Sequence, residues 1–125
     1  MATIINMTPH AISLYLITDC EEVVKGTYKS LVLKEGATPI AVYPSQGVAR
    51  AASSKELVYT INNIPVYTTV YGEPEGLPEP VLNTYFIVSA ITAQSAPERK
   101  DLLIVDGAVR DGEGKIVGCT AFGRI

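Results

Sequence analysis

The chain has 125 residues, of which 47% are hydrophobic and 18% are charged, and its formal net charge is −3. This length predicts a single domain over residues 1–125, large enough to bury a core without a metal or a disulfide scaffold. The composition excludes a disordered chain, and the acidic balance disfavours a protein that coats long nucleic acids.

The sequence gives no indication of a membrane or secreted protein. No apolar run approaches the roughly 18 residues of a membrane span. Residues 1–16 lack the basic flank and cleavage site of a secretion signal, so a cytoplasmic location is expected. Cys20 and Cys119 are then expected to be reduced thiols. His10 is the sole histidine, so neither a metal site nor a cofactor is predicted.

Short strand signals dominate the chain from its start to its end. Apolar, β-branched and aromatic residues form brief runs separated by Pro, Gly and Asn. Residues 19–26 interrupt this pattern as a polar, turn-like segment. Extended segments are expected at 2–6, 11–17, 27–34, 39–43, 48–52, 57–61, 64–71, 85–89, 102–105, 109–110 and 115–122. Some of these segments are too short to count as separate strands, so eight or nine strands are expected.

The connections between these runs complete the predicted fold. Asn62-Asn63 predicts a hairpin over residues 57–71, and the turn 111–114 predicts a second one. The Pro-rich stretch 72–80, GEPEGLPEP, predicts a loop with Leu77 as an apolar plug, and residues 89–95 predict a short helix. The sequence therefore predicts a mainly β (α+β) fold: a compact antiparallel sheet, sandwich or partial barrel with one or two short helices.

Residues that could carry catalysis are few. A Ser or Cys nucleophile usually needs a nearby base, and His10 lies in a turn after Pro9, where a structural role is favoured. Cys119 lies in an apolar strand and is interpreted as a core residue. The glutamates of the 72–80 loop are interpreted as solvated, and no phosphate-binding glycine motif is present. The chain is therefore not expected to be an enzyme.

The basic residues are the more informative set for binding. Arg110 comes at the end of a strand and is interpreted either as a surface residue paired with Asp111 or as a planar fork for a nucleotide. Thr92 and Gln94, on the predicted helix, are interpreted as exposed polar groups that read a base or ribose, or as a solvated face. The remaining basic candidates for ligand contact are Lys25, Lys29, Arg50 and Lys55.

Five segments together resemble a known family. They are INMTPHAI (5–12), YPSQGVARAASSKE (43–56), IPVYTTVYGEPEGLPEP (64–80), TYFIVSAITAQSAPERKDLL (84–103) and VRDGEGKIVG (109–118). In this order they are similar to the phage Thoeris anti-defense proteins of the first type. These proteins act as sponges that sequester cyclic nucleotide signals of bacterial anti-phage immunity.

The resemblance implies a non-enzymatic, host-cytoplasmic protein that binds glyco-cyclic ADP-ribose at dimer interfaces, with cyclic oligonucleotides at a separate interface in some members. It implies a homo-oligomer, either a dimer or a hexamer built from dimers. Arg110 matches the family's C-terminal pocket arginine, and Thr92 matches a polar helix contact. Lys25 and Lys29 match basic residues that face an oligonucleotide, so two separate basic sites are expected.

The sequence departs from the family pattern at two of these positions. Asn83 stands where an adenine-stacking aromatic is expected, which leaves Tyr85 or Phe86 for that role, and Ala93 replaces a polar contact. An alternative function is a structural or adaptor protein of a phage or prophage that docks on a partner through the 72–80 loop. A hydrolase that uses His10 is the third hypothesis.

Overall fold

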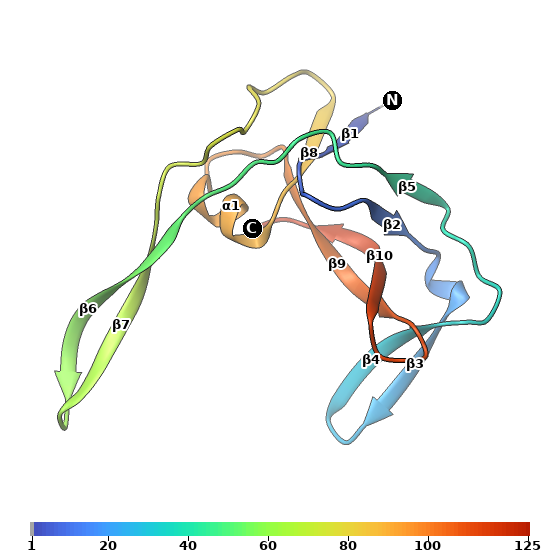
Figure 1. The fold of residues 1–125 in the computed structure, drawn as a ribbon, viewed down its shortest axis with the longest axis horizontal. Helices are drawn as coiled ribbons and strands as arrows, with labels where there is room; N and C mark the ends of the chain where they lie inside the picture. Colours follow the sequence, from blue (N-terminus) through green and yellow to red (C-terminus); the bar gives the residue numbers. More distant parts are fainter. Residues whose placement is uncertain (1) are drawn as a thin grey trace.

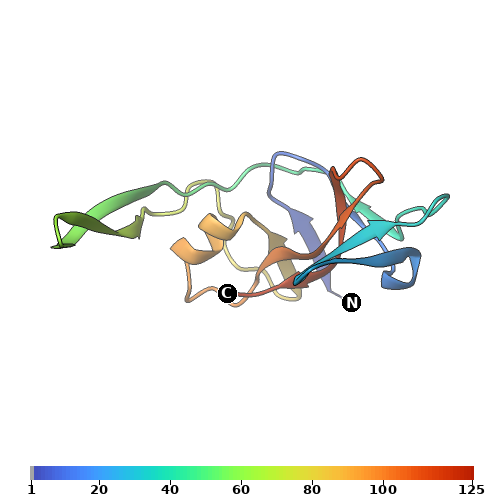
Figure 2. The same cartoon turned by 90° about the horizontal axis from the view of Figure 1, so that it is seen from below.

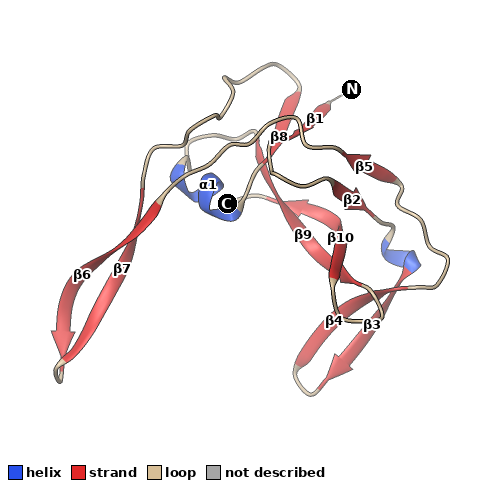
Figure 3. Ribbon diagram, viewed as in Figure 1, coloured by secondary structure: helices blue, strands red, loops and turns tan. Residues whose placement is uncertain are grey.

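The computed structural model describes residues 2–125 as ten strands, one α-helix and one short 3-10 helix (Figures 1 and 3). The strands are β1 (Thr3–Asn6), β2 (Ile12–Leu14), β3 (Cys20–Lys25), β4 (Tyr28–Leu33), β5 (Ala41–Tyr43), β6 (Ser53–Ile61), β7 (Ile64–Tyr71), β8 (Thr84–Ile87), β9 (Leu102–Arg110) and β10 (Ile116–Gly123). The helices are η1 (Ile17–Asp19) and α1 (Ala90–Ser95). The predicted mainly β fold with one short α-helix is confirmed.

Eight strands form one sheet that nearly closes on itself. Its main path is β1-β8-β9-β10-β2-β5, and β3 and β4 join it through the pairing of β4 with β9. Asn6, at the end of β1, bridges to Ser45 just after β5, so the first and last strands of the path meet. The sheet is thus a partial barrel.

The pairing within this sheet is mixed, whereas the sequence predicted an antiparallel sheet. The pairs β1–β8, β8–β9, β2–β10 and β4–β9 are parallel. The reason lies partly in β8, whose Phe86 and Ile87 are both buried, as is the following Val88. A strand buried on both faces reads as a continuous apolar run, which is typical of parallel pairing.

Two further local predictions are corrected by the structure. Residues 19–26 were expected to be turn-like, but β3 occupies most of them and pairs in a tight hairpin with β4 around Gly26. As an edge strand that pairs only with β4, β3 tolerates the charged residues Glu21 and Glu22. The strand expected over 11–17 is limited to β2, because the chain turns into η1.

The expected extended segment 48–52 has a single bridge, between Arg50 and Glu75. The strand expected over 102–105 continues to Arg110.

The hairpin β6–β7 and the loop after it follow the prediction. Asn62 and Asn63 both have positive φ, which suits the tight turn of a two-residue hairpin. Leu77 packs against the core cluster of Met7, Phe86 and Leu102 as an apolar plug. Figures 1 and 2 show the hairpin projecting from the rest of the molecule, and we call residues 53–71 the arm.

The buried side chains form two clusters. One gathers Met7, Ala49, Phe86, Val88 and Leu102 beneath α1. The other joins Tyr15, Cys20 and Val109 and lies against the β3–β4 hairpin. Gly118 lets β10 approach β2 closely, because a Cβ there would lie 2.5 Å from the Ser13 carbonyl oxygen.

Asn6 holds the closure of the sheet. Its side chain is fully buried, and its Nδ2 donates to the carbonyl oxygens of His10 (2.7 Å) and Tyr43 (2.8 Å). Its Oδ1 accepts from the backbone N–H (2.9 Å) and hydroxyl (2.7 Å) of Thr8. One amide therefore joins β1, the following turn and the end of β5.

Replacing Asn6 with Ala is expected to lower the free energy of unfolding by about 2–4 kcal/mol, because it removes a fully buried amide and leaves the backbone groups of His10, Tyr43 and Thr8 without this partner. Urea denaturation followed by circular dichroism measures this loss. Thr3→Ala, at an exposed position of the same strand, is the control and should change stability little. Equal stability of the two variants would contradict this role of Asn6.

A second polar contact fixes the loop before β8 to the segment before β9. Arg99 donates through Nε and Nη2 to both carboxylate oxygens of Asp101, at 2.8 Å each, and through Nη2 to the Pro78 carbonyl oxygen at 2.9 Å. Both side chains are largely buried. The hydrogen bonds from Arg99 lower the pKa of Asp101.

Asp101→Asn is expected to lower stability by roughly 1–3 kcal/mol near neutral pH. Because the folded-state pKa of Asp101 is lowered, its contribution is fully present above the ordinary carboxyl pKa of about 4 and disappears as the pH falls through the lowered value. Melting temperatures measured from acid to neutral pH should therefore converge for wild type and variant at the acid end. Glu113→Gln, an exposed control, should follow the wild type throughout.

Candidate functional site

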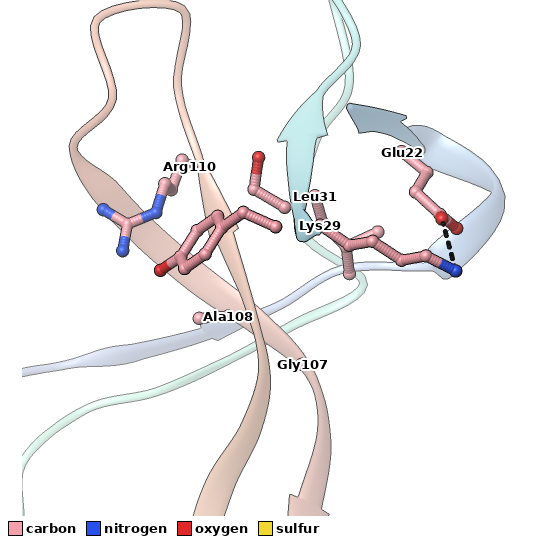
Figure 4. Close-up of a pocket in the computed structure, with 8 residues that line it drawn as sticks. Glu22, Lys29, Leu31, Gly107, Ala108 and Arg110 are labelled. Atoms are coloured by element: carbon pink, nitrogen blue, oxygen red, sulfur yellow. Dashed lines mark ion pairs between the residues drawn. The ribbon is translucent and has the colours of Figure 1, made fainter. Parts of the chain in front are cut away.

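Parallel pairing of β4 with β9 brings two distant segments of the chain together. Leu31 lies opposite Val109, and Val32 lies opposite Arg110. The residues that precede these pairs, on β4 and on β9, surround a depression of about 300 Å³. We call it the Arg110 depression; it is lined by Glu22, Tyr28, Lys29, Ser30, Leu31, Gly107, Ala108 and Arg110 (Figure 4).

Arg110 has hydrogen-bond donors to spare. Its Nη1 donates to the Gly114 carbonyl oxygen at 2.8 Å, which holds the guanidinium beside the β9–β10 turn. The expected partner Asp111 instead accepts from the backbone N–H groups of Glu113 (2.9 Å) and Lys115 (3.0 Å). Among the side chains that the structure describes, which leave out that of Lys25, the ion pairs are Lys29–Glu22 and Arg99–Asp101, so Arg110 takes part in none of them. A guanidinium has five N–H donors, and most of those of Arg110 are left for a ligand.

Lys29 lies on the other side of the same depression. Its Nζ is 3.5 Å from a Glu22 carboxylate oxygen, and both side chains are more than half exposed. Figure 4 shows this ammonium group turned toward Glu22 and away from Arg110. An exposed ion pair of this kind contributes little energy, so an anionic ligand could compete with Glu22 for Lys29.

Tyr28 supplies an aromatic surface to this site. It is 67% exposed, at the start of β4. With Ser30 and Arg110 it also lines an adjoining depression of about 470 Å³ that extends along the turn 111–114. A tyrosine ring and a guanidinium can both stack on a flat base, and the serine hydroxyl can donate or accept.

Gly107 forms part of the depression and shapes β9. Its φ is +62°, and a Cβ there would lie 2.1 Å from Oγ1 of Thr120. That hydroxyl donates to the Gly107 carbonyl oxygen at 3.2 Å. The backbone therefore bends at Gly107 just before Ala108, Val109 and Arg110.

Two predicted ligand contacts lie in the core instead. Thr92 was expected to present an exposed hydroxyl, but it is fully buried, and its Oγ1 contacts Oγ of Ser89 (2.9 Å) and donates to the Ala49 carbonyl oxygen (3.3 Å). Ala93 is 2% exposed and packs in the cluster beneath α1. The helix has only six residues, and the face that carries Thr92 and Ala93 packs inward, so neither residue reaches a surface ligand.

The other predicted contacts are spread over the molecule. Asn83 and Tyr85 line a depression of about 460 Å³ with the 98–101 segment. Arg50 lines a third depression, of about 350 Å³, and pairs through its backbone with Glu75. Gln94 accepts a hydrogen bond from the Tyr71 hydroxyl, and Lys55 is exposed on the arm. These residues do not form one site with Arg110.

The expectation of two separate basic sites stays a prediction. Lys29 and Arg110 both line the Arg110 depression, but the Lys29 ammonium is turned toward Glu22 and away from Arg110 (Figure 4). The side chain of Lys25 lies outside the described part of the structure; its backbone ends β3 opposite Tyr28.

Sequence reasoning grouped Tyr28 with the other tyrosines and did not consider Ser30. The sequence does contain a signal for these two residues: they alternate with Lys29 directly after a glycine turn.

Features that would favour catalysis or a metal are weak in the described residues. Cys20 and Cys119 are free thiols, as expected, and burial raises the pKa of each. A thiol with a raised pKa is a poor nucleophile. Residues 2–125 contain no group of three or more His, Cys, Asp or Glu arranged to hold a metal ion. None of their helices is long and apolar enough to cross a membrane.

Comparison with protein-family models, characterised proteins and solved structures finds no match to this chain.

Gly107→Ala is expected to destabilise the protein by roughly 2–4 kcal/mol, because the new Cβ meets Thr120 at a positive φ. Adding Thr120→Ala should recover part of this loss, since it removes the clash but not the backbone strain. Thermal melting of the single and double variants measures both effects. Gly112→Ala, where a Cβ meets nothing within 4 Å, is the control. A double variant no more stable than Gly107→Ala would refute the steric explanation.

Proposed function

We propose that the protein captures a small cyclic nucleotide in the Arg110 depression and holds it without chemical change. The ligand class follows from the resemblance of the sequence to sponge proteins of phages, whose ligands are glyco-cyclic ADP-ribose and cyclic oligonucleotides. Sequestering such a signal would counteract bacterial anti-phage defence. The protein would then work in the cytoplasm of the host cell, by binding alone.

The observation that supports this proposal best is the arginine with spare donors beside an exposed tyrosine. A cyclic nucleotide presents phosphate oxygens, ribose hydroxyls and a flat purine. The Arg110 guanidinium can donate to phosphate or stack on the base, Tyr28 offers a second stacking surface, and Ser30 can contact a hydroxyl. Lys29, turned toward Glu22, adds positive charge near the depression rather than a contact shared with Arg110. Capture without chemical change needs neither a general base nor any other catalytic residue.

The size of the depression suggests what is missing from a single chain. At about 300 Å³ it lies at the lower limit of typical ligand sites, and it is open to solvent on one side. A ligand held there by one chain remains partly hydrated. A second subunit would add another wall and exclude water, which fits the expected homo-oligomer.

The alternative of docking through the 72–80 loop has less support. The apolar side chain of Leu77 is committed to the core, and the Pro78 carbonyl oxygen accepts from Arg99. Glu75 is held by two backbone hydrogen bonds with Arg50, at 2.8 Å and 2.7 Å. The loop therefore has few groups left to recognise a partner other than exposed glutamates.

Arg110→Ala is expected to weaken nucleotide binding by about 10- to 100-fold, because a charge-assisted hydrogen bond contributes roughly 1.5–3 kcal/mol. Arg110→Lys should have an intermediate affinity, since it keeps the charge but loses the planar fork. Titration calorimetry with cyclic ADP-ribose, its glyco form and cyclic dinucleotides measures these affinities. Arg124→Ala, at an exposed arginine outside the Arg110 depression, is the control and should bind as the wild type does.

Lys29→Ala should weaken binding of the same ligand less than Arg110→Ala, and more at low salt than at high salt. Heating the complex and analysing the released ligand by mass spectrometry tests capture without turnover, and intact ligand is expected. Hydrolysed ligand would contradict a sponge, and unchanged affinity in Arg110→Ala would move the site elsewhere.

A further inference from the structure

The arm presents apolar side chains that the rest of its own chain does not cover. Figures 1 and 2 show it extending away from the barrel. Eight large hydrophobic residues of the arm are between 36% and 63% exposed: Leu57, Val58, Tyr59, Ile61, Ile64, Tyr67, Val70 and Tyr71. An isolated two-stranded hairpin is marginally stable in water, so this arm needs a partner surface.

A β-bulge gathers part of this apolar surface on one face of the tip. The register shifts between Leu57 and Tyr59, so that Tyr59 pairs with Val66 and Ile61 pairs with Ile64. Residues paired across two strands share a face, and so do residues two apart in one strand. Tyr59, Ile61, Ile64 and Val66 therefore lie together, while the pair Thr60–Pro65 lies on the opposite face.

The outer part of the arm also lacks charged side chains. No charged residue occurs between Leu57 and Gly72. Natural proteins protect exposed strand edges with charges or cover them with another element. The absence of charge favours an arm that is covered when the protein is assembled.

The barrel offers an apolar groove whose lining includes no residue of the arm. Its volume is about 650 Å³, the largest of the depressions described, and it lies between the 8–13 segment, the start of α1, β9 and β10. Its apolar lining includes Ile12, Val88, Ala90, Val105, Ile116 and Val117. Val105 and Ile116 are 50% and 54% exposed, so this groove too is uncovered in the single chain.

We propose that the arm of each chain docks with its Tyr59–Ile61–Ile64–Val66 face in the apolar groove of a second copy. Each chain carries one uncovered arm and one uncovered groove, so a reciprocal exchange about a twofold axis covers both and leaves no free end. A hairpin of eight or nine residues a strand spans roughly 27–30 Å, enough to reach a neighbouring barrel. This assembly stands independently of the proposed nucleotide capture.

The area involved suits a stable dimer. The Tyr59–Ile61–Ile64–Val66 face of the arm presents on the order of 400 Å² of surface. Reciprocal docking of two such faces, counted with the surface they cover, removes on the order of 1,600 Å² from water. Stable protein interfaces bury about 1,200–2,000 Å², so arm exchange alone supplies enough area.

Light scattering coupled to size-exclusion chromatography tests the proposal on the full chain without ligand. The wild type should have twice the 13.4 kDa chain mass or an even multiple of that value. Ile64→Glu on the arm face and Val105→Lys in the groove should each raise the dimer dissociation constant by about 100-fold or more. Thr60→Glu on the opposite face and Val42→Lys, at an exposed position of β5 outside the groove, are the controls. Circular dichroism should show every variant folded, because all four positions are exposed.

Mixing the Ile64→Glu chain with the Val105→Lys chain identifies the two docking partners. In this mixture the wild-type arm of the Val105→Lys chain docks in the wild-type groove of the Ile64→Glu chain. The other arm and groove bring the introduced carboxylate next to the introduced ammonium. A one-to-one heterodimer from two monomeric variants is therefore expected. A monomeric wild type would overturn the proposal. So would an Ile64→Glu monomer beside an undisturbed Val105→Lys dimer, since that pattern indicates that arms dock on arms.

Discussion

The buried amide of Asn6 is the constraint on which the barrel depends. A sheet whose path ends in β1 and β5 closes only if the polar backbone groups at that junction find partners. Asn6 satisfies the carbonyl oxygens of His10 and Tyr43 and the N–H of Thr8, while its own carbonyl oxygen accepts from Gln46 at 2.9 Å. Leaving a buried amide unpaired is costly, so this small network around Asn6 fixes how the turn after β1 and the end of β5 meet.

The candidate site depends on the mixed pairing of the closed sheet. An antiparallel meander would place Arg110 beside sequence neighbours only. The parallel contact between β4 and β9 instead places Tyr28, Lys29 and Ser30 next to a residue near the other end of the chain. The bend at Gly107 is fixed by the contact of this residue with Thr120. It sets the direction of the last residues of β9 and with it the position of the Arg110 guanidinium.

The arm and the barrel are stabilised in different ways. The barrel buries its apolar side chains in two clusters of its own, beneath α1 and beside the β3–β4 hairpin. The arm is anchored at its base by the hydrogen bond between Tyr71 and Gln94 and by the Gly72 N–H, which donates to the Ala52 carbonyl oxygen at 2.8 Å. Beyond this base its apolar side chains are solvated in the single chain. The uncovered apolar surface of the arm in a single chain is therefore the physical reason for the proposed exchange of arms.

Local sequence patterns determined most of the strands, the position of the Asn62-Asn63 turn and the start of the short helix. They also predicted that Leu77 points into the core. These features depend on propensity and turn chemistry within a few residues. The prediction that Arg110 is a binding residue came from its residue type and its place at a strand end. Only the tertiary structure decided which strands are neighbours, since pairing direction depends on closure of the whole sheet. For the same reason it alone put Tyr28 and Ser30 beside Arg110, buried Thr92 and Ala93, and made β3 a strand: a helix face or a polar edge acquires its environment from elements far away in the sequence.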